Sequence, residues 1–130
     1  MKRLQLYVET SVWNFYFADD APEKKEITIS FFEKVKQGEY EIFISDAVIE
    51  EIGRADDEKR QLLLNLIKEY EPKRLVINKE VVNLAQRYIS EGVFPENKIE
   101  DSVHASVASF FEMDALISWN LKHLANIRKM

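Results

Sequence analysis

The sequence predicts an α/β fold in which a central, mostly parallel sheet of four or five strands lies between two layers of helices. Short apolar runs with strand patterning alternate along the chain with amphipathic segments of helical periodicity. Such alternation is typical of a parallel sheet covered on both faces. Only three glycines and three prolines occur in 130 residues, so no flexible linker is evident. We therefore expect a single three-layer domain over residues 1–130.

The first 53 residues predict two strands and two helices. Residues 4–9 alternate apolar and polar side chains, which favours a first strand rather than a signal peptide. An irregular stretch then ends at Pro22, and residues 23–37 place apolar side chains on one helical face. Residues 41–44 form a short apolar run and predict the second strand. Residues 45–53 predict a helix, because the serine that begins this range is a favourable N-cap.

The middle of the chain continues the alternation. Residues 57–70 carry leucines at helical spacing and predict a helix closed by Pro72. Residues 75–77 predict the third strand from their consecutive branched apolar side chains. Residues 78–89 predict another helix, with Asn78 as its N-cap. A loop containing glycine and proline follows.

The last part of the chain predicts two helices around a strand. Asn97 followed by Glu100 has the spacing of a capping pair, so a helix is expected over residues 97–112. Residues 115–118 predict the fourth strand, and residues 121–127 a short final helix. The predicted strands therefore alternate with helices, which can serve as the crossover connections that a parallel sheet requires.

Composition excludes several classes of function. The chain contains no cysteine, which rules out a disulfide scaffold, a thiolate zinc site and a catalytic thiol, and which fits a cytoplasmic protein. No apolar run approaches the roughly 20 residues of a membrane span, so no membrane partner is expected. The net charge of −5 argues against a protein that coats nucleic acid by general electrostatics. It leaves room for an enzyme that gathers acids around a metal ion.

Candidate site residues are sought where the predicted strands end, because sites of parallel sheets lie beyond the carboxyl ends of their strands. Glu9 ends the first strand and precedes Thr10 and Ser11, whose hydroxyls could hold metal-bound water or stabilise the loop. Helical periodicity places Glu51 in or beside an apolar stripe and Glu50 on the polar face. A carboxylate in that stripe is costly unless it is paired or metal-bound. The alternative is a stripe-edge glutamate that reaches solvent.

Further candidates come from the second half of the chain. Asp101 lies near the start of its helix on the same face as His104, although an acid there can also simply complement the helix dipole. His104 could be a metal ligand, but a lone histidine is more often packed or on the surface. Asn120 follows the fourth strand, where it could serve the site or cap the next helix. Aromatic residues could stack on nucleobases or belong to the core or a dimer interface: Trp13, Phe15, Tyr16 and Phe17.

Glu9, Glu51 and Asp101 each lie at the end of an element that the predicted topology brings to one edge of the sheet. Clustered carboxylates repel one another and raise their own pKa values, and a divalent cation removes that conflict. Oxygen ligands favour Mg²⁺ or Mn²⁺. The three acids are therefore predicted to be metal ligands.

Four short motifs, in the same order and spread over nearly the whole chain, resemble those of PIN domains, particularly the VapC-type toxin ribonucleases of toxin–antitoxin pairs. They are residues 6–12, 44–52, 100–108 and 116–120. The resemblance implies a metal-dependent endoribonuclease that hydrolyses RNA phosphodiester bonds with metal-activated water. It also implies a homodimer and an antitoxin protein as partners.

By this resemblance, Glu9 stands where the family usually has aspartate, Glu51 at the helix glutamate and Asp101 at the third acid. Asn120 stands where many members have a fourth acid, and Thr10 or Ser11 would assist the first position. Residues expected to contact the RNA backbone are basic: Lys2, Arg3, Lys98, Lys122 and Arg128.

The alternative to a nuclease is a catalytically weak or inactive PIN-like module that binds RNA or protein, which the glutamate at position 9 and Asn120 favour. A phosphatase is less favoured, because no nucleophilic aspartate ends the first strand. A dinucleotide enzyme is not favoured either, because no glycine-rich turn follows that strand.

Overall fold

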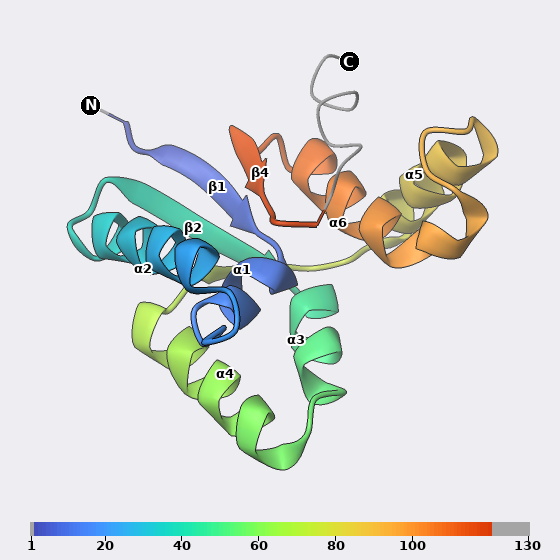
Figure 1. The fold of residues 1–130 in the computed structure, drawn as a ribbon. Helices are drawn as coiled ribbons and strands as arrows, with labels where there is room; N and C mark the ends of the chain where they lie inside the picture. Colours follow the sequence, from blue (N-terminus) through green and yellow to red (C-terminus); the bar gives the residue numbers. More distant parts are fainter. Residues whose placement is uncertain (1, 121–130) are drawn as a thin grey trace.

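The structure, a computed structural model, describes residues 2–120 and confirms the predicted α/β/α architecture (Figure 1). Four parallel strands form one sheet in the order β3-β2-β1-β4. The elements are β1 (Leu4–Val8), α1 (Thr10–Phe15), α2 (Pro22–Lys36), β2 (Tyr40–Ser45), α3 (Asp46–Gly53), α4 (Asp57–Tyr70), β3 (Lys73–Leu75), α5 (Lys79–Ser90), the 3-10 turn η1 (Glu96–Lys98), α6 (Ile99–Phe110) and β4 (Ala115–Ile117).

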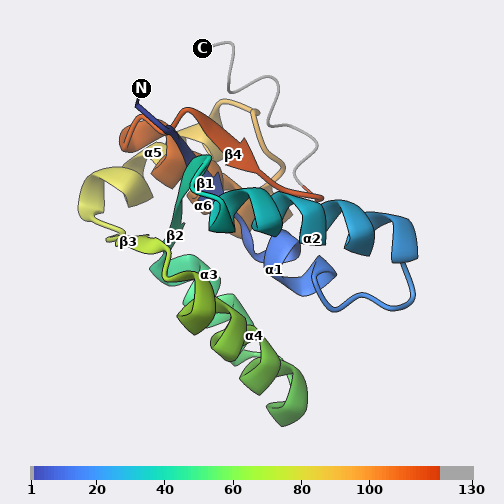
Figure 2. The ribbon, with the colours of Figure 1, turned by 90° about the vertical axis from the view of Figure 1, so that its left-hand side faces the viewer.

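Helices cover both faces of the sheet. Figures 1 and 2 show α1 and α2 on one face and α5 and α6 on the other, with α4 extending away beneath α1. Two predicted N-caps are present: Ser45 accepts a hydrogen bond from the backbone N–H of Ala47 at 3.2 Å, and Asn78 accepts one from that of Val81 at 2.8 Å. No helix within the described residues 2–120 has the length and apolar character needed to cross a membrane.

Aromatic residues form the centre of the core between the sheet and the helices around α1. Trp13 and Phe32 are fully buried with their ring centroids 4.9 Å apart, and the Trp13 indole N–H donates to the carbonyl of Val8 at 3.2 Å. Trp13 is therefore a core residue and unavailable for stacking on a nucleobase. Tyr16 and Phe17 also pack against this core.

Truncation of Phe32 should test how much this aromatic core contributes to the free energy of unfolding. Phe32→Ala removes a fully buried ring that also lies 4.9 Å from the ring of Tyr70, and it should lower the free energy of unfolding by about 3–5 kcal/mol. Phe110→Ala is the matched control, because Phe110 is 37% exposed. Urea denaturation measures both changes, and an equal loss in the two variants would contradict this assignment of the core.

The predicted third strand was two residues too late. The sequence predicts a strand over residues 75–77, whereas β3 occupies Lys73–Leu75 and pairs Leu75 with Ser45. Because β2 ends at Ser45, where α3 begins, residues beyond Leu75 have no partner strand to pair with. Val76 is accordingly exposed, despite its high β-propensity.

Two helix starts also differ from prediction. The stretch predicted to be irregular contains the short helix α1, whose N-cap is Glu9 rather than one of the usual capping residues. The predicted capping pair of Asn97 and Glu100 is wrong: α6 begins after η1, and Lys98 is its N-cap without a side-chain bond. Glu100 instead pairs at 2.5 Å with Arg54, the C-cap of α3. The predicted helix over residues 121–127 lies outside the described residues.

Candidate metal site

The strand order defines where a site is expected. From β1 the chain proceeds to β2 and β3 on one side, then returns to β4 on the other side of β1. The order therefore reverses between β1 and β4, and ligands of open α/β sheets bind at that point, beyond the carboxyl ends of the strands. Glu9 directly follows β1, and its backbone N–H donates to the carbonyl of Ile117 in β4 at 3.0 Å.

One carboxylate oxygen of Glu9 is held by three hydrogen bonds. Its Oε1 accepts from the Ser11 backbone N–H at 3.1 Å, the Ser11 hydroxyl at 2.5 Å and the Ser118 hydroxyl at 2.7 Å. The Ser11 hydroxyl in turn accepts from the backbone N–H of Trp119 at 2.9 Å. Glu9 is buried, so these bonds replace the water that the carboxylate has lost. Ser11 thus stabilises the loop and fixes Glu9 to the ends of both strands.

The face of α3 that carries Glu51 is the one that helical periodicity predicts. The Glu51 side chain is 17% exposed, whereas that of Glu50 is 75% exposed and lies 3.9 Å from Arg54. The Thr10 hydroxyl donates to Oε1 of Glu51, and His104 Nε2 lies 3.0 Å from each carboxylate oxygen. Burial alone would raise the pKa of Glu51. The hydrogen bond and electrostatic attraction of His104, the hydrogen bond of Thr10 and the charge of Arg54 together outweigh burial and lower that pKa below its usual range.

Glu9 and Glu51 come together with a third residue, His104. One possible ligand atom from each of the three lies within 4.8 Å of the other two, so among the described residues they form a group able to hold a metal ion. Sequence reasoning left His104 between a ligand and a packed residue. The available signal was its position three residues after Asp101, which places both side chains on one face of α6.

Asp101 lies beside this group but is not a member of it. It is partly buried in the first turn of α6. Burial raises the pKa of Asp101, and the negative charge of Glu9 raises it further, while Lys98 opposes the shift. The charges of Glu9 and Glu51 both act on Asp101, so Asp101 lies within electrostatic reach of the other two carboxylates.

The remaining predicted residues take different places. Thr10 supports Glu51 rather than Glu9. Asn120 is exposed in the segment that follows β4, and its backbone N–H donates to the Ser118 hydroxyl at 3.0 Å. Ser118, which the sequence did not single out, contacts Glu9 directly, whereas the described contact of Asn120 is with Ser118. The position of Ser118 directly after β4 was the available signal.

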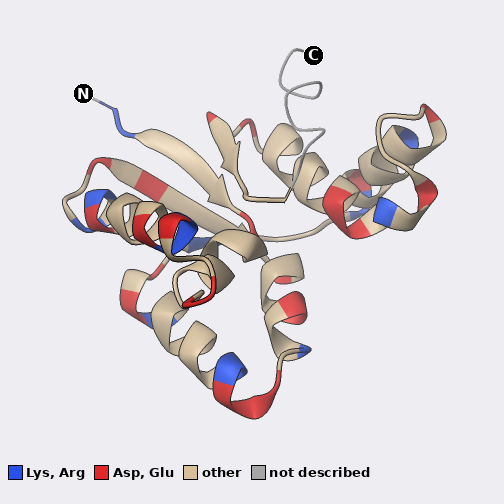
Figure 3. Ribbon diagram, viewed as in Figure 1, with Lys and Arg blue, Asp and Glu red and all other residues tan. Residues whose placement is uncertain are grey.

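Of the predicted basic contacts that lie within residues 2–120, Lys98 is the one whose charge acts on Asp101. Arg3 is at the opposite end of β1, roughly 20 Å from Glu9 along the strand, and pairs with Glu41 at 3.3 Å. Lys122 and Arg128 lie outside the described residues. Figure 3 shows acidic and basic residues interspersed along the helices.

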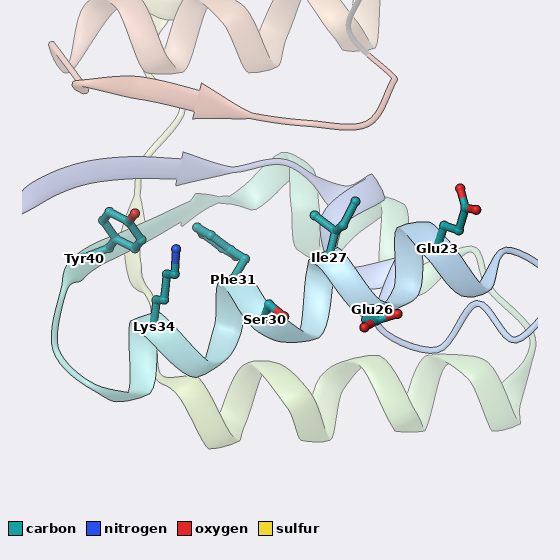
Figure 4. A pocket seen from close by; sticks show the side chains of 7 residues that line it. All are labelled: Glu23, Glu26, Ile27, Ser30, Phe31, Lys34 and Tyr40. Carbon is teal, nitrogen blue, oxygen red and sulfur yellow. The ribbon is translucent and has the colours of Figure 1, made fainter.

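A surface pocket on α2 does not belong to this site (Figure 4). It is lined by two acidic side chains, but by none of Glu9, Glu51 and His104. Its lining residues are Glu23, Glu26, Ile27, Ser30, Phe31, Lys34 and Tyr40.

No protein-family model matches this chain, and neither does any of the curated proteins compared with it. The relation to PIN domains therefore stays a prediction. What is known of the site is its geometry: two buried or half-buried carboxylates, a buried imidazole and a third carboxylate beside them, all at the point where the strand order reverses.

Proposed function

We propose that this protein is a metal-dependent endoribonuclease of the PIN type, with Glu9, Glu51 and Asp101 as ligands of one or two Mg²⁺ or Mn²⁺ ions. The observation that carries the proposal is the convergence of Glu9 and Glu51 from different elements, with ligand atoms within 4.8 Å, beside Asp101. A cluster of carboxylate oxygens fits a hard divalent cation.

The cation and the carboxylates would have different roles in phosphodiester hydrolysis. A bound cation would supply Lewis acidity to the phosphate and lower the pKa of a bound water. Hydrogen bonds from Ser11 and Ser118 orient the Glu9 carboxylate. Thr10 and His104 orient that of Glu51 in the same way. Asp101, partly exposed beside them, would be the third ligand, either directly or through a bound water.

The substrate and partners follow from the same proposal. RNA would approach the exposed side of the carboxylates, where Lys98 can contact a phosphate. The net charge of −5 means that such contacts must be local. A homodimer and an antitoxin protein are proposed as partners on the sequence resemblance alone.

Cleavage of RNA tests the proposal. Incubation of single-stranded and structured RNA with the protein should give cleavage in Mn²⁺ or Mg²⁺ and none after chelation with EDTA. Gel electrophoresis of end-labelled RNA measures it. The alternative, a catalytically weak module that binds RNA or protein, is favoured by the triple hydrogen bonding of one Glu9 oxygen, which leaves fewer lone pairs for a metal. Absence of cleavage together with absence of Mn²⁺ binding would support that module.

Metal binding should also stabilise the fold. A cation bound only to the folded protein at 100 times its Kd adds about 2.7 kcal/mol to the free energy of unfolding, on the order of 10 °C in Tm. Differential scanning fluorimetry should therefore show a rise in Tm with Mn²⁺ that EDTA reverses. Sodium chloride at matched ionic strength is the control, and an equal rise with that salt would mean simple screening of the acids.

A further inference from the structure

We propose that His104 is a positioning residue for Glu51, held in its Nε2–H form by a buried relay of hydroxyl groups from Tyr7 and Ser45. The expected effect of His104 on metal binding rests on the proposed function. The relay itself rests only on hydrogen-bond geometry within the described residues.

The relay is continuous and fully enclosed. The Ser45 and Tyr7 hydroxyl oxygens are 2.7 Å apart, and the Tyr7 hydroxyl lies 2.6 Å from His104 Nδ1. The opposite ring nitrogen, Nε2, reaches both oxygens of Glu51 at 3.0 Å. Tyr7, Ser45 and His104 are each 0% exposed, so water does not compete for these bonds. The chain of contacts therefore has one end in the core and the other at the candidate metal site.

The directions of the bonds follow from their two ends. An ionised Glu51 only accepts, so His104 Nε2 must carry a proton. At the other end, the Ser45 oxygen accepts from the backbone N–H of Ala47. If His104 is neutral, Ser45 donates to Tyr7, Tyr7 donates to Nδ1, and Nε2–H donates to Glu51. Every member then donates one hydrogen bond to the next.

The other protonation patterns leave a conflict. With the proton on Nδ1 alone, the Nε2 lone pair would face two carboxylate oxygens. With both nitrogens protonated, the hydroxyls must reverse, and the Ser45 proton would have no acceptor among the contacts described for it. Only the Nε2–H form satisfies the whole relay.

The sheet register makes this arrangement possible. Tyr7 pairs with Phe43, and side chains alternate along a strand, so Ser45, two residues further, points to the same face as Tyr7. That face is covered by α6, which carries His104. Ser45 is also the N-cap of α3, the helix that carries Glu51. The relay thus begins at the N-cap of α3, continues through Tyr7 of β1 and His104 of α6, and ends at Glu51, which is also in α3.

His104 could alternatively bind the metal directly, since it belongs to the group of possible ligands. Direct binding through Nε2 would require loss of its proton and of both hydrogen bonds to Glu51. A hydrogen bond from a second residue to a ligating carboxylate is a common support in metal sites, and its loss typically weakens metal affinity 10- to 100-fold. We assign His104 to that supporting role.

Nitrogen NMR of the uniformly labelled chain tests the relay directly. The spectrum of His104, assigned by comparison with His104→Gln, should show a protonated Nε2 and an unprotonated Nδ1, and it should keep this pattern when Mg²⁺ is added to saturation. A proton on Nδ1 in the metal-free protein would overturn the relay. Loss of the Nε2 proton on Mg²⁺ binding would make His104 a ligand and overturn the positioning role.

Two substitutions distinguish the roles of the two imidazole nitrogens of His104. The longer side chain of His104→Gln can place an amide N–H near the Nε2 position, whereas His104→Asn reaches only the Nδ1 position. In titration calorimetry with Mn²⁺, His104→Asn should weaken binding about 10- to 100-fold, and His104→Gln should restore most of the affinity. Equal affinity in both variants and the wild type would contradict the role. Circular dichroism checks that both remain folded.

Removal of a single hydroxyl provides a milder test that preserves packing. Tyr7→Phe should weaken Mn²⁺ binding and disturb the Nε2–H pattern in the NMR spectrum, while the control Tyr88→Phe, at a buried tyrosine packed against Phe94, should do neither. An unchanged His104 spectrum in Tyr7→Phe would overturn the relay. If the wild type binds no Mn²⁺ and cleaves no RNA, the proposed function fails, and the metal-free spectrum still decides the relay.

Discussion

Replacing Glu51 by glutamine should lower Mn²⁺-dependent RNA cleavage by at least about 100-fold, whereas the same replacement at Glu50 should change it little. Glu51 points inward, is held by Thr10 and His104, and belongs with Glu9 to the group that could hold a metal ion. Its amide would keep the size of the side chain but lose the charge and one acceptor oxygen. End-labelled RNA under single-turnover conditions gives the rate constant.

Glu50→Gln is a close control because the two residues are neighbours on one helix. Both substitutions remove one negative charge from α3 with the same side-chain chemistry, so effects on helix propensity and long-range electrostatics are matched. Only the direction of the side chain differs, with 17% of Glu51 and 75% of Glu50 exposed. Similar cleavage by the two variants, whether high or low, would contradict the assignment of Glu51 to the site.

Asp101→Asn should have two opposite effects: loss of Mn²⁺-dependent cleavage by a similar factor, and a metal-free protein that is more stable than the wild type. Burial and the charge of Glu9 raise the pKa of Asp101 in the folded protein. A raised carboxyl pKa means that folding disfavours the charged form, so ionisation of Asp101 opposes folding at neutral pH. Removing that charge should therefore raise Tm in EDTA.

The pH dependence of this gain follows from the same shift. Below the unfolded-state pKa of aspartate, about 3.9, the carboxyl is protonated in both states and the substitution should give no electrostatic gain. The gain should develop as pH rises through the raised folded-state pKa and then stay constant. Thermal melts across this range measure it, with Glu100→Gln as control at a solvent-exposed acid paired with Arg54. A lower Tm for Asp101→Asn at neutral pH in EDTA would contradict the electrostatic account.

The architecture was predictable because it depends on patterns that extend over many residues. The alternation of strands and helices, and the caps at Ser45 and Asn78, follow from hydrophobic periodicity and from side-chain oxygens at helix starts. The position of β3 was not predictable from its own residues. Its limits depend on where β2 ends, which is a property of a segment about 30 residues earlier in the chain.

The site was predictable to the extent that local geometry governs it. The choice of Glu51 over Glu50 needed only the periodicity of one helix, and Glu9 needed only its place after the first strand. The spacing from Asp101 places His104 on the right face of α6, but its contact with Tyr7 depends on which side chains of the sheet meet that helix, and no local pattern contains that information. The sequence therefore indicates the acids and the neighbouring hydroxyls of Thr10 and Ser11, whereas the contacts of Tyr7 and Ser118 are seen only in the structure.

The most direct test of the central claim is crystallography of the protein soaked with Mn²⁺, using anomalous scattering to locate the ion. The proposal predicts a peak about 2 Å from carboxylate oxygens of Glu9 and Glu51, with Asp101 as a further direct or water-mediated ligand. A peak found only at exposed acids elsewhere, such as Glu23 and Glu26 on α2, or no peak at saturating Mn²⁺, would contradict it.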